Sequence, residues 1–178
     1  MKVYKLKEES IPLYVNKVNG LVGKIIAFAL IIAVLVMLLP LIMTKNMEML
    51  SIYGASMLFT GLVVAGIYHN NKKFSKLCAE NLEVIITADS ITRKIDMENE
   101  TRMNFFHKFS FNGAKHTAGF YTQIPFNNIK SIETKNGDIW VKAKNFNMLN
   151  GQNMLVISQY LHDFDELEKL TNELKKTL

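Results

Sequence analysis

IPFNNIKSIETKNGDIWVKAK, residues 124–144, is the stretch that decides the fold of the C-terminal part of this 178-residue chain. Asn136-Gly137 stands between two runs rich in β-branched residues. The pair suits a type I′ turn, because both central residues of that turn need a positive φ. After the turn, Ile139 and Val141 alternate with Trp140, as in a strand that buries one face. The stretch therefore predicts an antiparallel hairpin in a small β domain.

Further strand signals lie on both sides of this hairpin. Residues 83–87 and 91–96 flank a turn at residues 88–90 and predict a first hairpin. Asn150-Gly151 predicts another turn, which leads into a strand over residues 154–158. Asn112-Gly113 lies in a longer polar stretch, residues 108–119, which we expect to form an extended hairpin tip or a mobile loop. The whole segment over residues 98–119 is longer than a plain hairpin needs.

The chain ends in HDFDELEKLTNELKKTL, residues 162–178, which predicts an amphipathic helix. Asp163 is a suitable N-cap and Glu166 follows three residues later, as in a capping box. One helical face carries apolar side chains, namely Phe164, Leu167, Leu170 and Leu174. A sheet with one open side needs an apolar cover, and this helix can provide it.

Two uncharged runs stand near the front of the chain, at residues 25–43 and 49–68. A helix over the first run is about 28 Å long, close to the hydrocarbon thickness of a bilayer. The run starts late and a second run follows it, so a cleaved signal peptide does not fit. We therefore predict a transmembrane hairpin, with helices at about residues 22–43 and 49–68.

Lysines cluster before the first run and after the second, which by the positive-inside rule places both termini in the cytoplasm. The expected location is the inner or plasma membrane, with two crossings. Gly54, Gly61 and Ala65 fall on one face of the second helix. Small residues let another backbone approach closely, so this face predicts either packing within the hairpin or a dimer.

The predicted organisation is an N-terminal cytoplasmic segment (1–20), the hairpin (21–70), a linker (71–80) and a β domain (81–178). The order of elements resembles that of the bacterial pleckstrin-homology-like (PH-like) domains found on small membrane proteins. The resemblance is carried by VIITADSITRKI (84–95), QIPFNNIKSIET (123–134), GDIWVKAKN (137–145) and FDELEKLTNELKK (164–176). It implies a curved seven-stranded antiparallel sheet or barrel, capped by a C-terminal helix. The expected class is an α+β membrane protein.

No arrangement of residues indicates catalysis, a cofactor or a metal. His69, His107, His116 and His162 lack metal-ligand spacing, and we expect each to be a surface or capping residue. Cys78 is the single cysteine, so an intrachain disulfide is impossible, and the thiol is either a small buried apolar group or an acylation site. We therefore expect a protein that is not an enzyme.

The leading functional hypothesis is a PH-like domain that binds a protein partner, or another copy of the chain, at the inner membrane surface. The alternative is a sensor of anionic lipid. Its candidate surface contacts are Lys72, Lys73, Lys76, Lys108 and Lys115, with His116 beside the last of them. The net charge of +5 is concentrated around the apolar runs and forms no basic stripe, so no nucleic-acid partner is expected. The position of Trp140 fits a place under the helix, a partner surface or a bilayer interface equally well.

Overall fold

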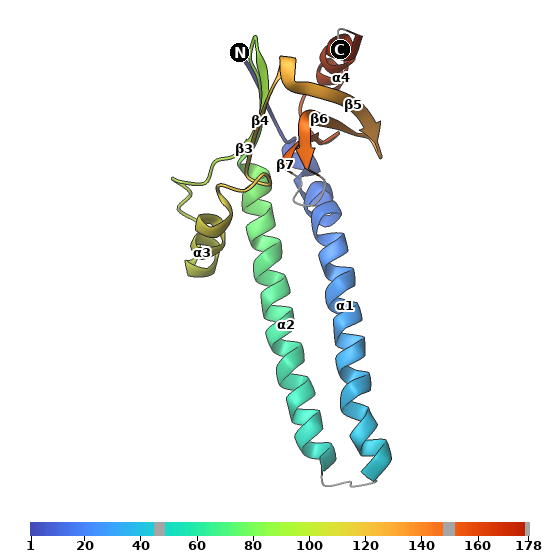
Figure 1. The fold of residues 1–178 in the computed structure, drawn as a ribbon. Coiled ribbons are helices and arrows are strands. Elements are labelled where there is room, and N and C mark those ends of the chain that lie inside the picture. Colours follow the sequence, from blue (N-terminus) through green and yellow to red (C-terminus); the bar gives the residue numbers. More distant parts are fainter. Residues whose placement is uncertain (45–48, 148–151, 177–178) are drawn as a thin grey trace. The chain divides into compact units, whose positions relative to one another are not determined.

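The structure of the protein is a computed structural model that describes residues 1–44, 49–147 and 152–176 (Figure 1). In chain order the elements are β1 (Lys2–Lys5), η1 (Glu8–Ser10), α1 (Ile11–Thr44), α2 (Met49–Glu80), β2 (Leu82–Ile86), β3 (Ser90–Ile95), α3 (Phe105–Ala114), β4 (Tyr121–Pro125), η2 (Phe126–Asn128), β5 (Ile129–Lys135), β6 (Asp138–Asn147), β7 (Gln152–Ile157) and α4 (Phe164–Lys176).

The chain divides into two compact units. Unit 1 combines Met1–Tyr14 with Lys76–Leu178 and contains the strands, α3 and α4, whereas unit 2 is Val15–Ser75 and contains most of the two long helices. The N-terminus thus belongs to the same unit as the β domain, although residues 1–20 read as a separate segment in the sequence. The long helices are an insertion between two paired strands of unit 1.

The first sheet of unit 1 has the strand order β1-β2-β3-β4, with antiparallel neighbours throughout. The β2–β3 pair, in which Ile86 faces Ile91, confirms the first predicted hairpin. β1 was not expected, because four residues are too few for an alternating pattern to indicate a strand. Its register, with Val3 opposite Ile85, is fixed by a pairing across the whole helical insertion, and Tyr4 is buried.

The second sheet has the order β5-β6-β7. Asn136 and Gly137 have φ angles of 53° and 81° and join β5 to β6, which confirms the turn predicted at this pair. Ile139 and Val141 are buried, as the alternation indicated. The strand expected at residues 154–158 is present as β7, while the turn predicted at Asn150-Gly151 lies outside the described residues.

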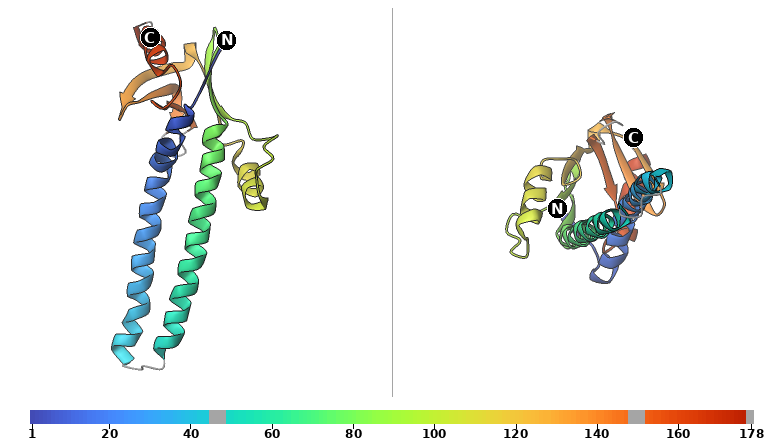
Figure 2. Two further views of the ribbon diagram at one scale, coloured as in Figure 1. Left: turned by 180° about the vertical axis from the view of Figure 1, so that it is seen from behind. Right: turned by 90° about the horizontal axis from the view of Figure 1, so that it is seen from below.

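The apolar core of unit 1 draws on both sheets and on α4. Its fully buried large side chains include Ile91, Ile124, Ile129, Ile139, Leu155, Ile157, Leu161 and Leu167. α4 begins where predicted and lies against β5, with Leu167 and Thr171 buried (Figures 1 and 2). The carboxylate of Glu166 accepts a hydrogen bond from Lys2, so this residue ties α4 to the N-terminus of the chain.

Unit 2 is an antiparallel pair of helices, and a cluster of polar contacts around Asn19 links them. Asn19 is 3% exposed and donates from Nδ2 to the Val15 carbonyl at 2.9 Å. Its Oδ1 accepts hydrogen bonds from Asn71 Nδ2 and Ser75 Oγ, each at 3.2 Å, and so links α1 to α2. One helical turn further along α1, a Cβ on Gly23 would lie only 3.6 Å from the Tyr68 ring, which shows how closely the helices approach there.

The predicted transmembrane hairpin is the main correction. A helix that crosses a bilayer needs about 20 consecutive, predominantly apolar residues. Over the residues that the structure describes, no helix offers a stretch that is both long enough and apolar enough to make the crossing. This finding overturns the membrane-protein class with spans at residues 22–43 and 49–68. It equally overturns the multi-pass location in the inner or plasma membrane with cytoplasmic termini.

Residues 108–119 differ from the expected hairpin tip or mobile loop, because the helix α3 extends to Ala114. Asn112-Gly113, which favours a turn in isolation, lies inside the last turn of this helix. Tertiary packing explains the difference. His107 and Phe111 lie four residues apart on one helical face and are both buried, and their burial offsets the poor helix propensity of the glycine.

Candidate functional site

The insertion between β3 and β4 carries the most unusual surface of unit 1. At its start, the side chain of Asn104 caps α3 by accepting a hydrogen bond from the His107 backbone N–H at 2.8 Å. On the inner face, the Phe111 ring packs against Phe120, with 5.8 Å between the ring centroids. The cap and the inward ring fix the rotation of the helix about its axis, and so they decide which side chains face outward.

The outward face of α3 is aromatic. Phe105, Phe106 and Phe109 are 76%, 67% and 75% exposed, and the first two rings meet edge to face. Positions i, i+1 and i+4 fall on one side of a helix. Phenylalanine is normally among the most buried residue types, and a solvated cluster of three calls for an explanation beyond folding.

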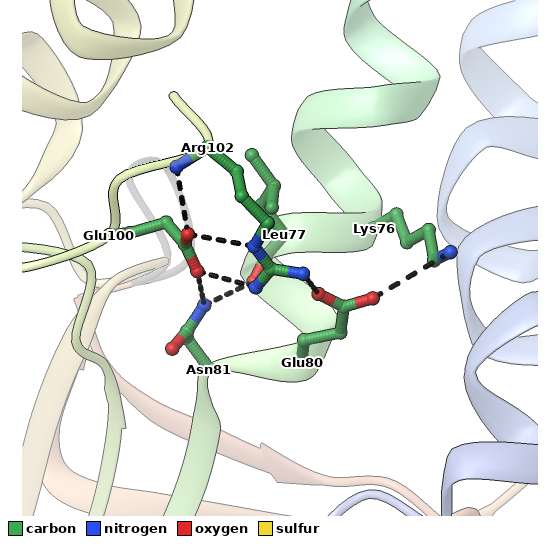
Figure 3. A network of polar contacts seen from close by, with 6 residues as sticks. All are labelled: Lys76, Leu77, Glu80, Asn81, Glu100 and Arg102. Carbon is green, nitrogen blue, oxygen red and sulfur yellow. Dashed lines mark hydrogen bonds and ion pairs between the residues drawn. The ribbon is translucent and has the colours of Figure 1, made fainter. Parts of the chain in front are cut away.

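A network of polar contacts secures the chain that leads into α3 (Figure 3). The guanidinium of Arg102 donates to Glu80 at 2.6 Å and to Glu100 at 2.8 and 2.5 Å. Asn81 donates to Glu100 at 3.2 Å and to the Leu77 carbonyl at 2.9 Å, and Lys76 pairs with Glu80 at 3.7 Å. The network joins the end of α2 to the start of the insertion.

This network also sets the electrostatics of its carboxylates. The hydrogen bonds from Arg102 to Glu100 lower the pKa of the Glu100 carboxyl to about 2. The Glu100 side chain is only 9% exposed, whereas that of Arg102 is 57% exposed, so solvent reaches this ion pair from the arginine side. At the far end of the insertion, Arg93 donates to the carbonyl of Gly119, and both ends are therefore held.

An open groove of about 630 Å³ runs between α3 and the chain that precedes it. It is lined by Glu98, Asn99, Glu100, Thr101, Met103, Lys108, Phe111, Asn112 and Lys115. Two of the predicted lipid contacts, Lys108 and Lys115, thus lie on one groove. They are seven residues apart, which places them on the same flank of the helix. Among the described residues neither forms an ion pair.

The other predicted contacts are not gathered with this pair. Lys72 and Lys73 are exposed on the part of α2 that belongs to unit 2. Lys76 belongs to unit 1 and is exposed, but its amine is engaged with Glu80. Lys72, Lys73 and Lys76 thus follow one side of α2, whereas Lys108 and Lys115 share the groove beside α3.

The exposed aromatic face is the feature that the sequence analysis missed. Its signal is the string NFFHKFSF, residues 104–111, in which Asn104 is a good N-cap and aromatic residues recur at helical spacing. A helix was not predicted here because the pair Asn112-Gly113, which follows, indicates a turn.

The remaining polar candidates have structural environments. His107 is 4% exposed, which contradicts the surface or capping role expected of it, because it lies on the inward face of α3. Burial raises the pKa of the Cys78 thiol to about 12. Trp140 is half-buried, and within the described part of the chain its indole N–H has no hydrogen-bond partner. No group of three or more potential metal ligands occurs among the described residues.

Comparisons with known proteins give no relative of this chain: no family model, no curated protein and no solved structure matches it.

Proposed function

We propose that this chain is a non-catalytic binding protein that associates with another copy of itself through the long helices of unit 2. One observation carries the proposal. Large apolar side chains are exposed along both helices, among them Phe28, Ile31, Leu35, Ile52, Leu58, Phe59, Leu62 and Ile67. Soluble monomers rarely expose contiguous apolar patches of more than a few hundred Å². A second chain with the same faces supplies a matching apolar cover.

The glycines of α2 support close approach of a partner. A Cβ built at Gly54 or Gly61 meets no described atom within 4 Å, so among the described residues nothing fills the space beside these two glycines. Ala65 lies on the same face and is exposed. Small residues at such positions let two helix backbones come together. Of the two interpretations that the sequence left open for this face, the open space favours dimer formation.

In the proposed assembly, unit 1 is the part that binds a further partner. Its two antiparallel sheets, followed by a C-terminal helix against β5, support the proposal that unit 1 is a PH-like domain. Unit 1 is then a module that binds a protein partner, because its described side chains form structural ion pairs and no reactive group is found among them.

The molar mass of the full chain in buffer without detergent tests self-association. Light scattering coupled to gel filtration should give a multiple of the 20.3 kDa chain mass. Leu58→Ser with Leu62→Ser removes two apolar side chains that are 73% and 74% exposed, and it should return the protein to one chain. Lys72→Ser, on an exposed polar position of the same helix, is the matched control and should leave the mass unchanged.

Two results would contradict the proposal. One is a wild-type protein that stays at the mass of a single chain at every concentration. The other is a Leu58/Leu62 variant that keeps the mass of the wild type while its helix content, from circular dichroism, is unaltered.

A further inference from the structure

The two faces of α3 have different surroundings, one buried in unit 1 and the other exposed to solvent. His107 and Phe111 point inward and complete the packing of the insertion, while the three exposed rings of Phe105, Phe106 and Phe109 add nothing to the core of unit 1. Because the helix is capped and its inner face is packed, the rings cannot turn inward without breaking these contacts. An apolar surface that covers these three rings must therefore come from outside unit 1.

The charged residues in the part of the insertion that carries this face have one sign. From Thr101 to Phe120 the insertion contains no acidic residue, but it contains three basic ones, Arg102, Lys108 and Lys115. Lys108 and Lys115 stand on one flank of the aromatic face. Glu98 and Glu100 line the groove beside them, but Glu100 is held by Arg102 and Asn81. A ligand for this surface thus needs apolar material in the middle and negative charge beside it.

We propose that α3 is an interfacial helix that binds the surface of an anionic lipid bilayer without crossing it. The three phenylalanine rings enter the boundary between headgroups and acyl chains, and Lys108 and Lys115 contact lipid phosphates. Amphipathic helices with aromatic residues on the apolar face and lysines beside it lie in the membrane interface in this way. An acidic protein would satisfy the lysines, but three exposed rings within little more than one helical turn match a fluid apolar phase better.

The proposal goes beyond self-association and concerns a different unit of the chain, so either can fail without the other. Full-length protein is mixed with vesicles of phosphatidylcholine, or of phosphatidylcholine with phosphatidylglycerol. In the variant Phe106→Trp the new indole reports on α3 itself, and wild-type protein, whose one tryptophan is Trp140, gives the background emission. Anionic vesicles should shift the added emission to shorter wavelength, and brominated acyl chains should quench it.

Two variants test the two halves of the surface. Phe106→Ser with Phe109→Ser should weaken partition onto anionic vesicles by at least about tenfold, because two side chains lose apolar burial. Lys108→Gln with Lys115→Gln should weaken it about fivefold for each lysine, and the effect should vanish on neutral vesicles. Lys130→Gln with Lys169→Gln removes two exposed lysines from elsewhere in unit 1 and should change little. Thermal unfolding of every variant shows whether it is folded.

The proposal is overturned if the added tryptophan gives the same emission with and without anionic vesicles. It is also overturned if both double variants, shown to be folded, bind these vesicles as well as the wild type does. If the phenylalanine variant instead changes the molar mass of the protein in the absence of lipid, the face is an interface between protein chains and the lipid assignment is wrong.

Discussion

Gly137 shows how one residue fixes a register. Its φ of +81° is costly for any residue with a Cβ, and an added Cβ would lie 2.1 Å from the side-chain oxygen of Gln159. The preceding Asn136 tolerates a positive φ better than most residues. The turn therefore depends on both residues of the pair, but only position 137 requires a residue without a side chain.

Gly137→Ala should lower the free energy of unfolding by roughly 1–3 kcal/mol, because alanine is strained in a left-handed backbone conformation and its Cβ displaces Gln159. Urea denaturation measures the change. Gly113→Ala is the matched control. It lies in α3 with open space around its Cβ, and it should raise the free energy of unfolding by up to about 1 kcal/mol. Equal effects at the two sites would contradict this account.

Cys78 shows how burial decides reactivity. Burial raises the pKa of its thiol to about 12, so at pH 8 very little reactive thiolate is present. A thiol reagent should label the native protein at least about a hundred times more slowly than protein unfolded in urea, where the pKa returns toward 8.5. Labelling of the native protein at the rate of the unfolded chain would show that the residue is accessible.

At the scale of elements, the insertion between β3 and β4 is held by charge. Arg102 lowers the pKa of Glu100 from 4.5 to about 2, so the folded state favours the ionised carboxylate. The stability that this preference contributes is complete above pH 4.5 and is lost as the pH falls toward 2. Glu133, whose pKa the hydrogen bonds from Lys135 and Lys142 lower to about 2, adds to the same acid sensitivity.

Glu100→Gln should destabilise the protein at neutral pH and make its stability less steeply dependent on pH between 4.5 and 2. Thermal unfolding across this range measures the slope for wild type and variant. Glu98→Gln, an exposed position in the same loop, is the control and should retain the wild-type slope. If Glu100→Gln also retained the wild-type dependence of stability on pH, the network in Figure 3 would not hold the insertion to α2.

At the scale of the whole molecule, two compact units share one chain, and Asn19 belongs to unit 2 alone. Asn19→Ala should weaken the contact between α1 and α2 by roughly 1–2 kcal/mol, because Asn71 and Ser75 lose their acceptor. Hydrogen exchange should therefore accelerate at residues 15–25 and 68–75 and stay unchanged in β2–β7. Asn16→Ala, exposed one helical turn away, is the control. Faster exchange throughout both units would mean that they unfold together.

The candidate site was predictable only in part. Lys108 and Lys115 were selected from their charge alone, and the structure places them on one groove. The phenylalanines beside them could not be assigned to a surface, because an exposed ring and a buried ring look alike in a sequence. Only the cap at Asn104 and the inward packing of His107 and Phe111 decide which rings face outward.

The sequence by itself determined the elements that depend on neighbouring residues: the turn at Asn136-Gly137, the hairpin of β2 and β3, and the amphipathic helix α4. Local conformational preference and the period of apolar residues are enough for these. The tertiary structure alone decided that β1 joins β2 across the helical insertion, and that residues 105–114 form a helix despite Asn112-Gly113. Both depend on contacts between distant residues, whose free energy no local pattern contains.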